Sequence, residues 1–118
     1  ARLLAREVVR GYHLARPFNN GTHVADVSAL VAHLLANPWS GFDAVVLGAR
    51  GQIRVRDAIE RLAAGLEVKA IVEETPPAKP SFTLCSDRAV ARWGYDPPEI
   101  GALIDRYAAD VLAWQRGN

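Results

Sequence analysis

The arrangement of apolar residues is the feature that most limits the folds open to this chain of 118 residues. Two short apolar runs, 44–47 and 68–72, have the length and composition of buried strands. Apolar residues at helical spacing predict three longer helices, over 26–36, 55–66 and 98–112. Two strands are too few for a self-sufficient doubly wound sheet, so the apolar stripes of these helices need a partner surface. The pattern therefore predicts a small, helix-rich α/β lobe.

Signals near the start of the chain predict where the first helices begin and end. Residues 2–10 carry a short apolar stripe at helical spacing, and Gly11 is a suitable stop for a helix there. Asp26 is expected to cap the next helix, because its carboxylate can accept N–H groups of the first turn. Asn37-Pro38 ends that helix, since the residue before a proline disfavours helical geometry.

The second half of the chain carries similar signals. The three prolines of residues 73–80 predict a loop. Ser86 can cap a short helix that ends at Gly94, and Pro98 suits the first turn of the last helix. No internal repeat or domain boundary interrupts the pattern, so residues 1–118 are interpreted as a single domain or as a fragment of one.

Composition excludes several classes of partner. The formal net charge is +1 with both signs spread along the chain, which argues against nucleic acid as a ligand. No apolar run approaches the roughly 20 residues that a membrane-spanning helix needs. Cys85 is the single cysteine, so no intrachain disulfide forms, which fits a cytoplasmic protein. We expect its thiol to be buried and inert.

Two segments resemble the C-terminal third of the extended short-chain NAD(P)-dependent sugar-nucleotide epimerases and dehydratases. Thr22-His23-Val24-Ala25-Asp26-Val27 is similar to the His-Val-x-Asp-Val segment of that family. Residues 85–97 are similar to its Asp-x-x-Lys/Arg-Ala and Gly-Tyr/Trp-x-Pro segment. The resemblance covers nearly the whole chain. It implies a substrate-binding lobe that covers the sugar nucleotide, while an N-terminal lobe outside this chain holds NAD or NADP.

The groups that bind the dinucleotide and carry out the chemistry in that family do not appear in this chain. Gly48-Ala49-Arg50-Gly51 follows an expected strand, but the third glycine of a dinucleotide fingerprint would fall at Arg54. The family's Tyr-x-x-x-Lys pair is also missing, because neither Lys69 nor Lys79 has a tyrosine four residues before it. We therefore expect this chain to supply no catalytic residue and to bind no cofactor by itself.

Histidines do not indicate a metal centre. His13, His23 and His33 are evenly spaced by ten residues, a spacing that does not match the helical period and that no single strand is expected to span. No cysteine or carboxylate cluster accompanies them, as a zinc site would require. The expectation is that the chain holds no metal.

Five polar residues are the candidates for substrate binding. Arg16, Asn19 and Asn20 lie in an irregular segment, where an arginine can hold a diphosphate bidentately and asparagines can bond to sugar hydroxyls. Lys79 and Arg88 can complete a cationic rim around such a ligand. The alternative is that all five are exposed polar residues with no ligand.

Two functions from different classes follow. The first is the substrate-binding C-terminal portion of an NAD(P)-dependent nucleotide-sugar epimerase or dehydratase, with the nucleotide sugar and the N-terminal lobe as its partners. The second is a non-catalytic interaction module that dimerises through its exposed apolar stripes. An independent small hydrolase is disfavoured, because no nucleophile and base occur at a recognisable spacing.

Overall fold

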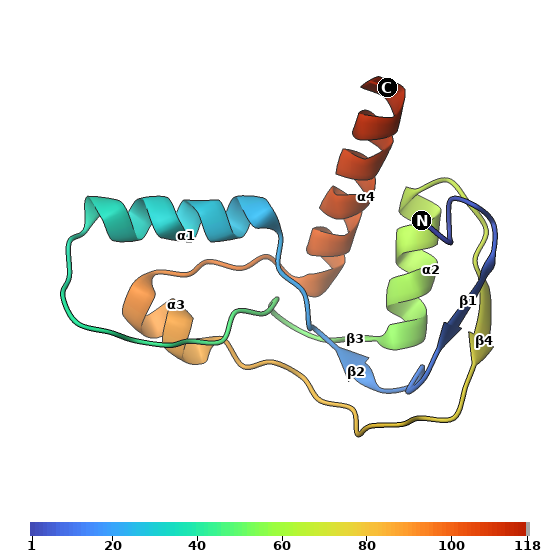
Figure 1. Ribbon diagram of the computed structural model, residues 1–118, viewed down its shortest axis with the longest axis horizontal. Coiled ribbons are helices and arrows are strands. Elements are labelled where there is room, and N and C mark those ends of the chain that lie inside the picture. The colour runs from blue at the N-terminus through green and yellow to red at the C-terminus, as the bar shows by residue number, and fades with distance from the viewer. Residues whose placement is uncertain (118) are drawn as a thin grey trace.

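The chain folds into a flat, open α/β arrangement (Figure 1). The structure, a computed structural model, describes residues 1–117. It measures 48 × 39 × 19 Å along its principal axes, with a Cα radius of gyration of 16.4 Å. A compact domain of this length has a radius of gyration of about 13.5 Å. The expected class, helix-rich α/β with few short strands, is confirmed, and the low strand content leaves the molecule without a central closed sheet.

Helices occupy the regions that the apolar spacing predicts. In residues 1–117 they are α1 (Val24–Ala36), α2 (Val55–Gly65), α3 (Asp87–Trp93) and α4 (Ile100–Gly117). Helix α3 ends as expected at Gly94, which adopts the left-handed conformation with φ of +71°. Ser86 occupies the N-cap position of α3 without a side-chain capping bond, because its hydroxyl instead bonds to Gly48.

The predicted cap of α1 is wrong by one turn. Helix α1 begins at Val24 behind His23, whose ring Nδ1 accepts a hydrogen bond from the Ala25 N–H at 3.1 Å. Asp26 lies inside the first turn, and its carboxylate bonds to Arg106 of α4 instead. The helix still ends where expected, at Asn37. A long-range ion pair thus takes the side chain that local rules assign to capping.

Four short strands form two separate pairs in residues 1–117. Strands β1 (Val8–Gly11) and β4 (Ile71–Glu74) pair in parallel, and β2 (Pro17–Phe18) pairs antiparallel with β3 (Ile53–Arg54). The predicted strand over 68–72 is half right, because β4 begins three residues later and runs into the proline-rich loop.

Two sequence-based predictions of secondary structure are wrong. Residues 2–10 form a turn followed by strand β1 in place of a helix, because Arg6 has φ of +56° and the backbone of β1 pairs with β4. Residues 44–47 form no strand, because none of the four strands lies beside them to accept their hydrogen bonds. The apolar side chains of Val45 and Leu47 still contribute to the core, because they pack against the cluster between α1 and α3.

Two apolar clusters hold the fold together. The first joins α2 to α4, and Arg61 and Asp105 close its rim with two hydrogen bonds of 2.8 and 2.7 Å. Its buried members are Ala49, Ala58, Ile100, Leu103 and Ile104. The second joins α1 to α3 and is formed by Leu30, Ala89 and Tyr95. Figure 1 shows these pairs of helices in different halves of the molecule, linked by extended segments.

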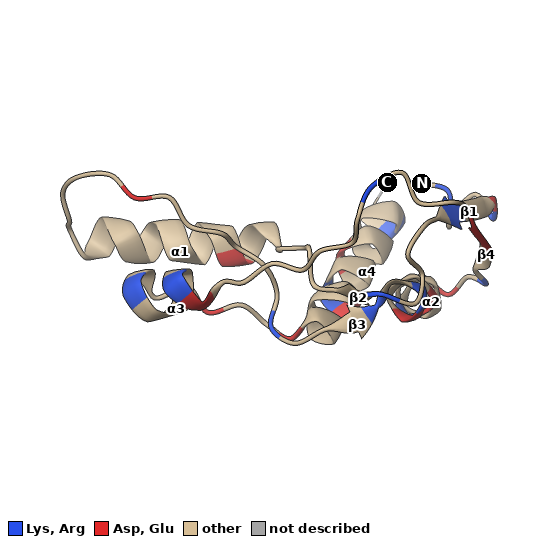
Figure 2. Ribbon diagram, turned by 90° about the horizontal axis from the view of Figure 1, so that it is seen from below, with Lys and Arg blue, Asp and Glu red and all other residues tan. Residues whose placement is uncertain are grey.

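Acidic and basic residues occur in both halves of the chain trace and alternate along it (Figure 2). In this view α1 and the β1–β4 pair lie toward one broad side, while α3, β2 and β3 lie toward the other. No helix within the described residues is long and apolar enough to cross a membrane.

Candidate functional site

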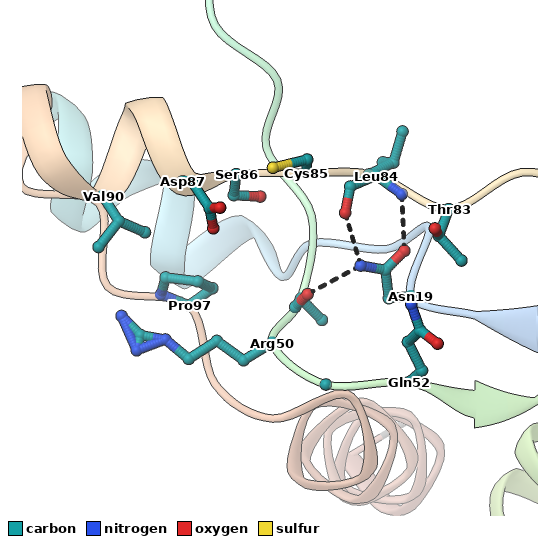
Figure 3. A pocket seen from close by; sticks show the side chains of 12 residues that line it. Asn19, Arg50, Gln52, Thr83, Leu84, Cys85, Ser86, Asp87, Val90 and Pro97 are labelled. Carbon is teal, nitrogen blue, oxygen red and sulfur yellow. Dashed lines mark hydrogen bonds between the residues drawn. The ribbon is translucent and has the colours of Figure 1, made fainter.

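Asn19 lies where segments from three parts of the chain meet (Figure 3). It directly follows β2 and is 5% exposed. Its Nδ2 group donates to the carbonyls of Ala49 at 3.1 Å and Leu84 at 2.7 Å, and its Oδ1 accepts from the Leu84 N–H at 2.8 Å. The amide predicted to bind sugar hydroxyls is therefore engaged within the chain, where it ties β2 to two distant loops.

A pocket of about 700 Å³ opens beside this amide (Figure 3). Arg50 contributes its cation, but Asp96 lies 3.2 Å from that guanidinium. Ser86 contributes a hydroxyl that accepts from the Gly48 N–H at 2.7 Å and donates to the Gly48 carbonyl at 3.1 Å. The Arg50 guanidinium and the Ser86 hydroxyl are thus engaged within the chain, which limits what they can offer a ligand.

Cys85 lies in the wall of the same pocket and is exposed, so the expectation of a buried thiol is wrong. The preceding segment crosses the surface in an extended form toward α3, and Ser86, not Cys85, turns into the interior. A hydroxyl can satisfy the Gly48 N–H and carbonyl there, which explains why the polar residue is the buried one.

A second pocket, of about 430 Å³, contains Arg16. An adjoining pocket of about 280 Å³ shares much of its wall and adds Tyr12 and Asn20. We call the two together the Arg16 crevice; its lining residues are Tyr12, His13, Arg16, Pro17, Phe18, Asn20, Val55, Pro80, Ser81, Phe82 and Thr83. Within residues 1–117 the exposed Arg16 makes no ion pair, so its guanidinium is available to an anion.

Lys79 is held close to this crevice. The ring of His13 donates a hydrogen bond from Nε2 to the carbonyl of Lys79, which fixes the proline-rich loop against the segment after β1. His13 has φ of +58°, and its ring meets Tyr12 edge to face at 5.7 Å between centroids. The structure therefore brings Arg16, Asn20 and Lys79 to one region, although 63 residues separate the first from the last.

Arg88 does not belong to that group. It lies on α3, and its guanidinium bonds to the Asp43 carboxylate at 2.7 Å. Asp43 also accepts the Trp93 indole N–H at 2.7 Å and has Arg92 at 3.7 Å. Trp93 contributes most to lowering the pKa of Asp43, the Ala44 N–H and both arginines lower it further, and burial acts in the opposite direction. Arg88 thus fastens the loop after α1 to α3.

The three histidines have separate structural roles. His13 holds the Lys79 carbonyl, and His23 caps α1 while bonding through Nε2 to Asp110 of α4 at 2.7 Å. His33 lies against Gly94, where an added Cβ would approach its Nε2 to 2.7 Å. In the part of the chain that the structure describes, no three metal-ligating side chains come together.

Sequence reasoning missed the aromatic walls of the Arg16 crevice. Tyr12 is 49% exposed and Phe82 is 68% exposed, and both rings line the crevice. The position of Phe82, two residues after the proline-rich loop, was the available signal. Tyr12 and Phe82 line one pocket although they are 70 residues apart in the sequence, so their proximity has no local signature.

The two segments at 22–27 and 85–97 are joined directly. The hydroxyls of Thr22 and Tyr95 lie 3.1 Å apart, and the Tyr95 hydroxyl donates to the Gly48 carbonyl at 3.3 Å. Comparisons with protein-family models, curated proteins and solved structures find no match to this chain. A functional interpretation therefore depends on these residues and their geometry.

Proposed function

We propose that this chain is the substrate-binding C-terminal portion of an NAD(P)-dependent nucleotide-sugar epimerase or dehydratase and has no catalysis of its own. The contact between Thr22 and Tyr95 is the observation that carries the proposal. These residues belong to the two segments that resemble that family, and 73 residues separate them. The two segments that resemble the family are distant in sequence but in contact in the fold. Such contact is expected if both belong to one lobe.

The Arg16 crevice supplies the chemistry for the ligand. A guanidinium without a carboxylate partner is suited to a diphosphate, which it can hold through two parallel N–H bonds. The exposed rings of Tyr12 and Phe82 offer faces against which a base or a sugar can pack. Asn20 accepts the Asn19 N–H through its Oδ1 at 3.3 Å, which leaves its side-chain N–H groups for a sugar hydroxyl.

Exposed surface supports the assignment to one lobe of a larger protein. The chain exposes 7922 Å². A compact monomer of the same mass exposes about 6,300 Å², so the excess is roughly 1,600 Å². Stable interfaces bury about 800 Å² or more on each partner, and the excess is large enough to supply such an interface.

Calorimetric titration of the chain with UDP-glucose, dTDP-glucose and NAD, each alone, tests the proposal. We expect weak binding of at least one sugar nucleotide and no binding of NAD. Arg16→Ala should weaken the sugar-nucleotide affinity at least about tenfold, which corresponds to about 1.4 kcal/mol. Arg16→Lys should recover only part of it, because an ammonium cannot bind bidentately.

Arg116→Ala is the matched control, because Arg116 is an exposed arginine in a loose pair with Glu67 at 3.8 Å. Equal affinities of Arg16→Ala and Arg116→Ala for the sugar nucleotides would contradict the role of the Arg16 crevice. Absence of sugar-nucleotide binding in the unmodified chain would contradict the proposed function itself.

A dimerising interaction module is the second candidate, and α1 favours it. This helix is apolar around most of its circumference, and Val24, Val31 and Leu35 are 73%, 49% and 78% exposed. A helix that is apolar on all sides is normally buried. Analytical ultracentrifugation with and without nucleotides decides between the candidates. A dimer that Leu35→Lys abolishes and that does not respond to nucleotides would support this second function.

A further inference from the structure

His23 is a titratable residue at the junction of α1 and α4, and its side chain is only 10% exposed. Both nitrogens of its ring are in use. Nδ1 accepts the Ala25 N–H at 3.1 Å, and Nε2 lies 2.7 Å from Oδ2 of Asp110 on α4. The imidazole therefore caps one helix and connects it to another.

The two partners of the ring fix its protonation state. A backbone N–H can only donate, so the Nδ1 atom that accepts it carries no proton. A carboxylate oxygen can only accept, so the proton of the ring lies on Nε2 and is directed at Asp110. A neutral ring with its proton on Nε2 satisfies both contacts, whereas the other neutral tautomer satisfies neither.

Polar contacts hold the first turn of α1 to α4. Besides the His23–Asp110 contact, Asp26 of α1 bonds to Arg106, which lies one helical turn before Asp110. In residues 1–117 one apolar cluster joins α2 to α4 and the other joins α1 to α3, and neither joins α1 to α4. A change in the charge of His23 therefore acts on one of the two ion pairs at this junction.

Other titratable groups near the junction have partners elsewhere. On α4, Asp105 bonds to an arginine of α2, and Tyr107 lines the groove between these two helices. The Tyr95 hydroxyl bonds to Thr22. The Asp110 carboxylate is thus the charged group that the His23 ring contacts directly.

A proton added to Nδ1 removes the cap. It would face the Ala25 N–H, and the positive ring would lie at the N-terminal end of α1, where the helix dipole is also positive. The contact through Nε2 would become stronger, because a hydrogen bond between an imidazolium and a carboxylate is charge-assisted. The doubly protonated ring therefore keeps Asp110 and loses Ala25.

We propose that His23 is a pH-dependent cap, whose neutral ring closes the first turn of α1 and whose protonation opens that turn while the bond to Asp110 remains. Histidine suits such a switch, because it is the side chain that ordinarily changes charge between about pH 5 and 8. The inference does not depend on the ligand of the Arg16 crevice.

NMR of the unmodified chain tests the proposal directly. At pH 7.5 the nitrogen signals of the His23 ring should show its proton on Nε2. Amide exchange at Ala25, expressed relative to an unstructured peptide at the same pH, should become at least about fivefold faster between pH 7.5 and pH 5. The Leu103 amide, which bonds to the Glu99 carbonyl in α4, should keep its protection and report that the chain stays folded.

His23→Asn separates the cap from the titration. Asparagine retains a side-chain oxygen that can cap the helix and does not gain a proton in this range, so Ala25 should stay protected at both pH values. His33→Asn is the matched control, because it removes the other histidine of α1 and should leave the response to pH unchanged.

Three results would overturn the proposal. The first is a proton on Nδ1 of His23 at pH 7.5, and the second is equal relative exchange at Ala25 at both pH values. The third is a response to pH that persists in His23→Asn or disappears in His33→Asn.

Discussion

The side-chain amide of Asn19 bonds to both backbone groups of Leu84, 65 residues further along the chain. The same amide reaches the Ala49 carbonyl, and the Asn19 carbonyl accepts the Ala49 N–H at 3.1 Å. A single buried side chain thereby joins the segment after β2 to the loops that precede β3 and α3. Its geometry is that of a structural connection between the two halves of the molecule.

Replacing Asn19 with alanine should destabilise the chain by about 2 kcal/mol, because the Leu84 N–H and two carbonyls would lose their partner in a buried position. Asn19→Asp should destabilise it further at neutral pH, since a carboxylate would face the Ala49 and Leu84 carbonyls. Urea unfolding monitored by circular dichroism measures both effects. Asn20→Ala is the control, with an expected loss below about 1 kcal/mol; equal losses at positions 19 and 20 would contradict the assignment.

Asp43 should make the stability of the chain depend on pH in the acid range. Its pKa is lowered in the folded state, chiefly by the Trp93 indole N–H. The stabilisation is therefore complete above the ordinary aspartate pKa of about 3.9 and is lost as the pH falls through the lower folded-state value. Thermal unfolding of the unmodified chain and of Asp43→Asn, measured from pH 2 to 7, checks this sign.

The two melting temperatures should converge as the pH falls and differ most near neutrality. Asp57→Asn is a suitable control, because Asp57 is a carboxylate that also bonds to an arginine, Arg54, but on the surface of α2. A difference between Asp43→Asn and the unmodified chain that stays constant over the whole range would refute the linkage.

Gly65 should be a position at which alanine is harmful despite its helical location. Alanine is favoured over glycine by about 1 kcal/mol inside a helix. Here an added Cβ would lie 2.7 Å from the Cβ of Ala108 on α4, closer than packed carbon atoms allow. We expect Gly65→Ala to destabilise the chain by about 1 kcal/mol or more, measured by urea unfolding.

A second substitution isolates the contact. In a double-mutant cycle, Ala108→Gly should recover stability in the Gly65→Ala background while lowering it in the unmodified chain. Ala64→Gly, one residue earlier on the exposed side of α2, measures the ordinary cost of glycine in this helix. If Gly65→Ala proves stabilising, α2 and α4 do not approach each other as described.

Cys85 should react with a soluble thiol reagent in the folded chain without denaturant, because its side chain is exposed. Mass spectrometry should show one label per molecule, at a rate close to that of the same chain in urea. A folded chain that reacts at least about a hundredfold more slowly than the unfolded one would show the thiol to be buried after all.

Helices were predictable because their signals are local. The stripe of α4 includes Ile100, Leu103 and Ile104, all of which are buried against α2 as the spacing indicates. Tyr107 belongs to the same stripe but is 51% exposed, since the position of the partner helix decides how much of a stripe is covered. The cap of α1 failed as a prediction for a similar reason, because Arg106 takes the Asp26 carboxylate.

Strands were predicted less well, because a strand exists only where another strand supplies its hydrogen bonds. Residues 44–47 have the composition of a strand and no neighbour to pair with, whereas 8–11 have a weaker pattern and a neighbour in β4. The positions of the predicted binding residues also depend on partners that are distant in sequence. Arg88 was expected beside Arg16, but Asp43 holds it on α3.

The sequence alone determined the four helices of residues 1–117, the α/β class and the shortage of strands, because spacing, proline and glycine act over a few residues. Only the tertiary structure decided that Asn19 is a buried connection, that Arg16 remains free and that β1 pairs with β4. Those outcomes depend on which groups meet across 30 to 65 residues of chain. Such meetings are set by packing and hydrogen-bond satisfaction of the whole molecule, which no local pattern encodes.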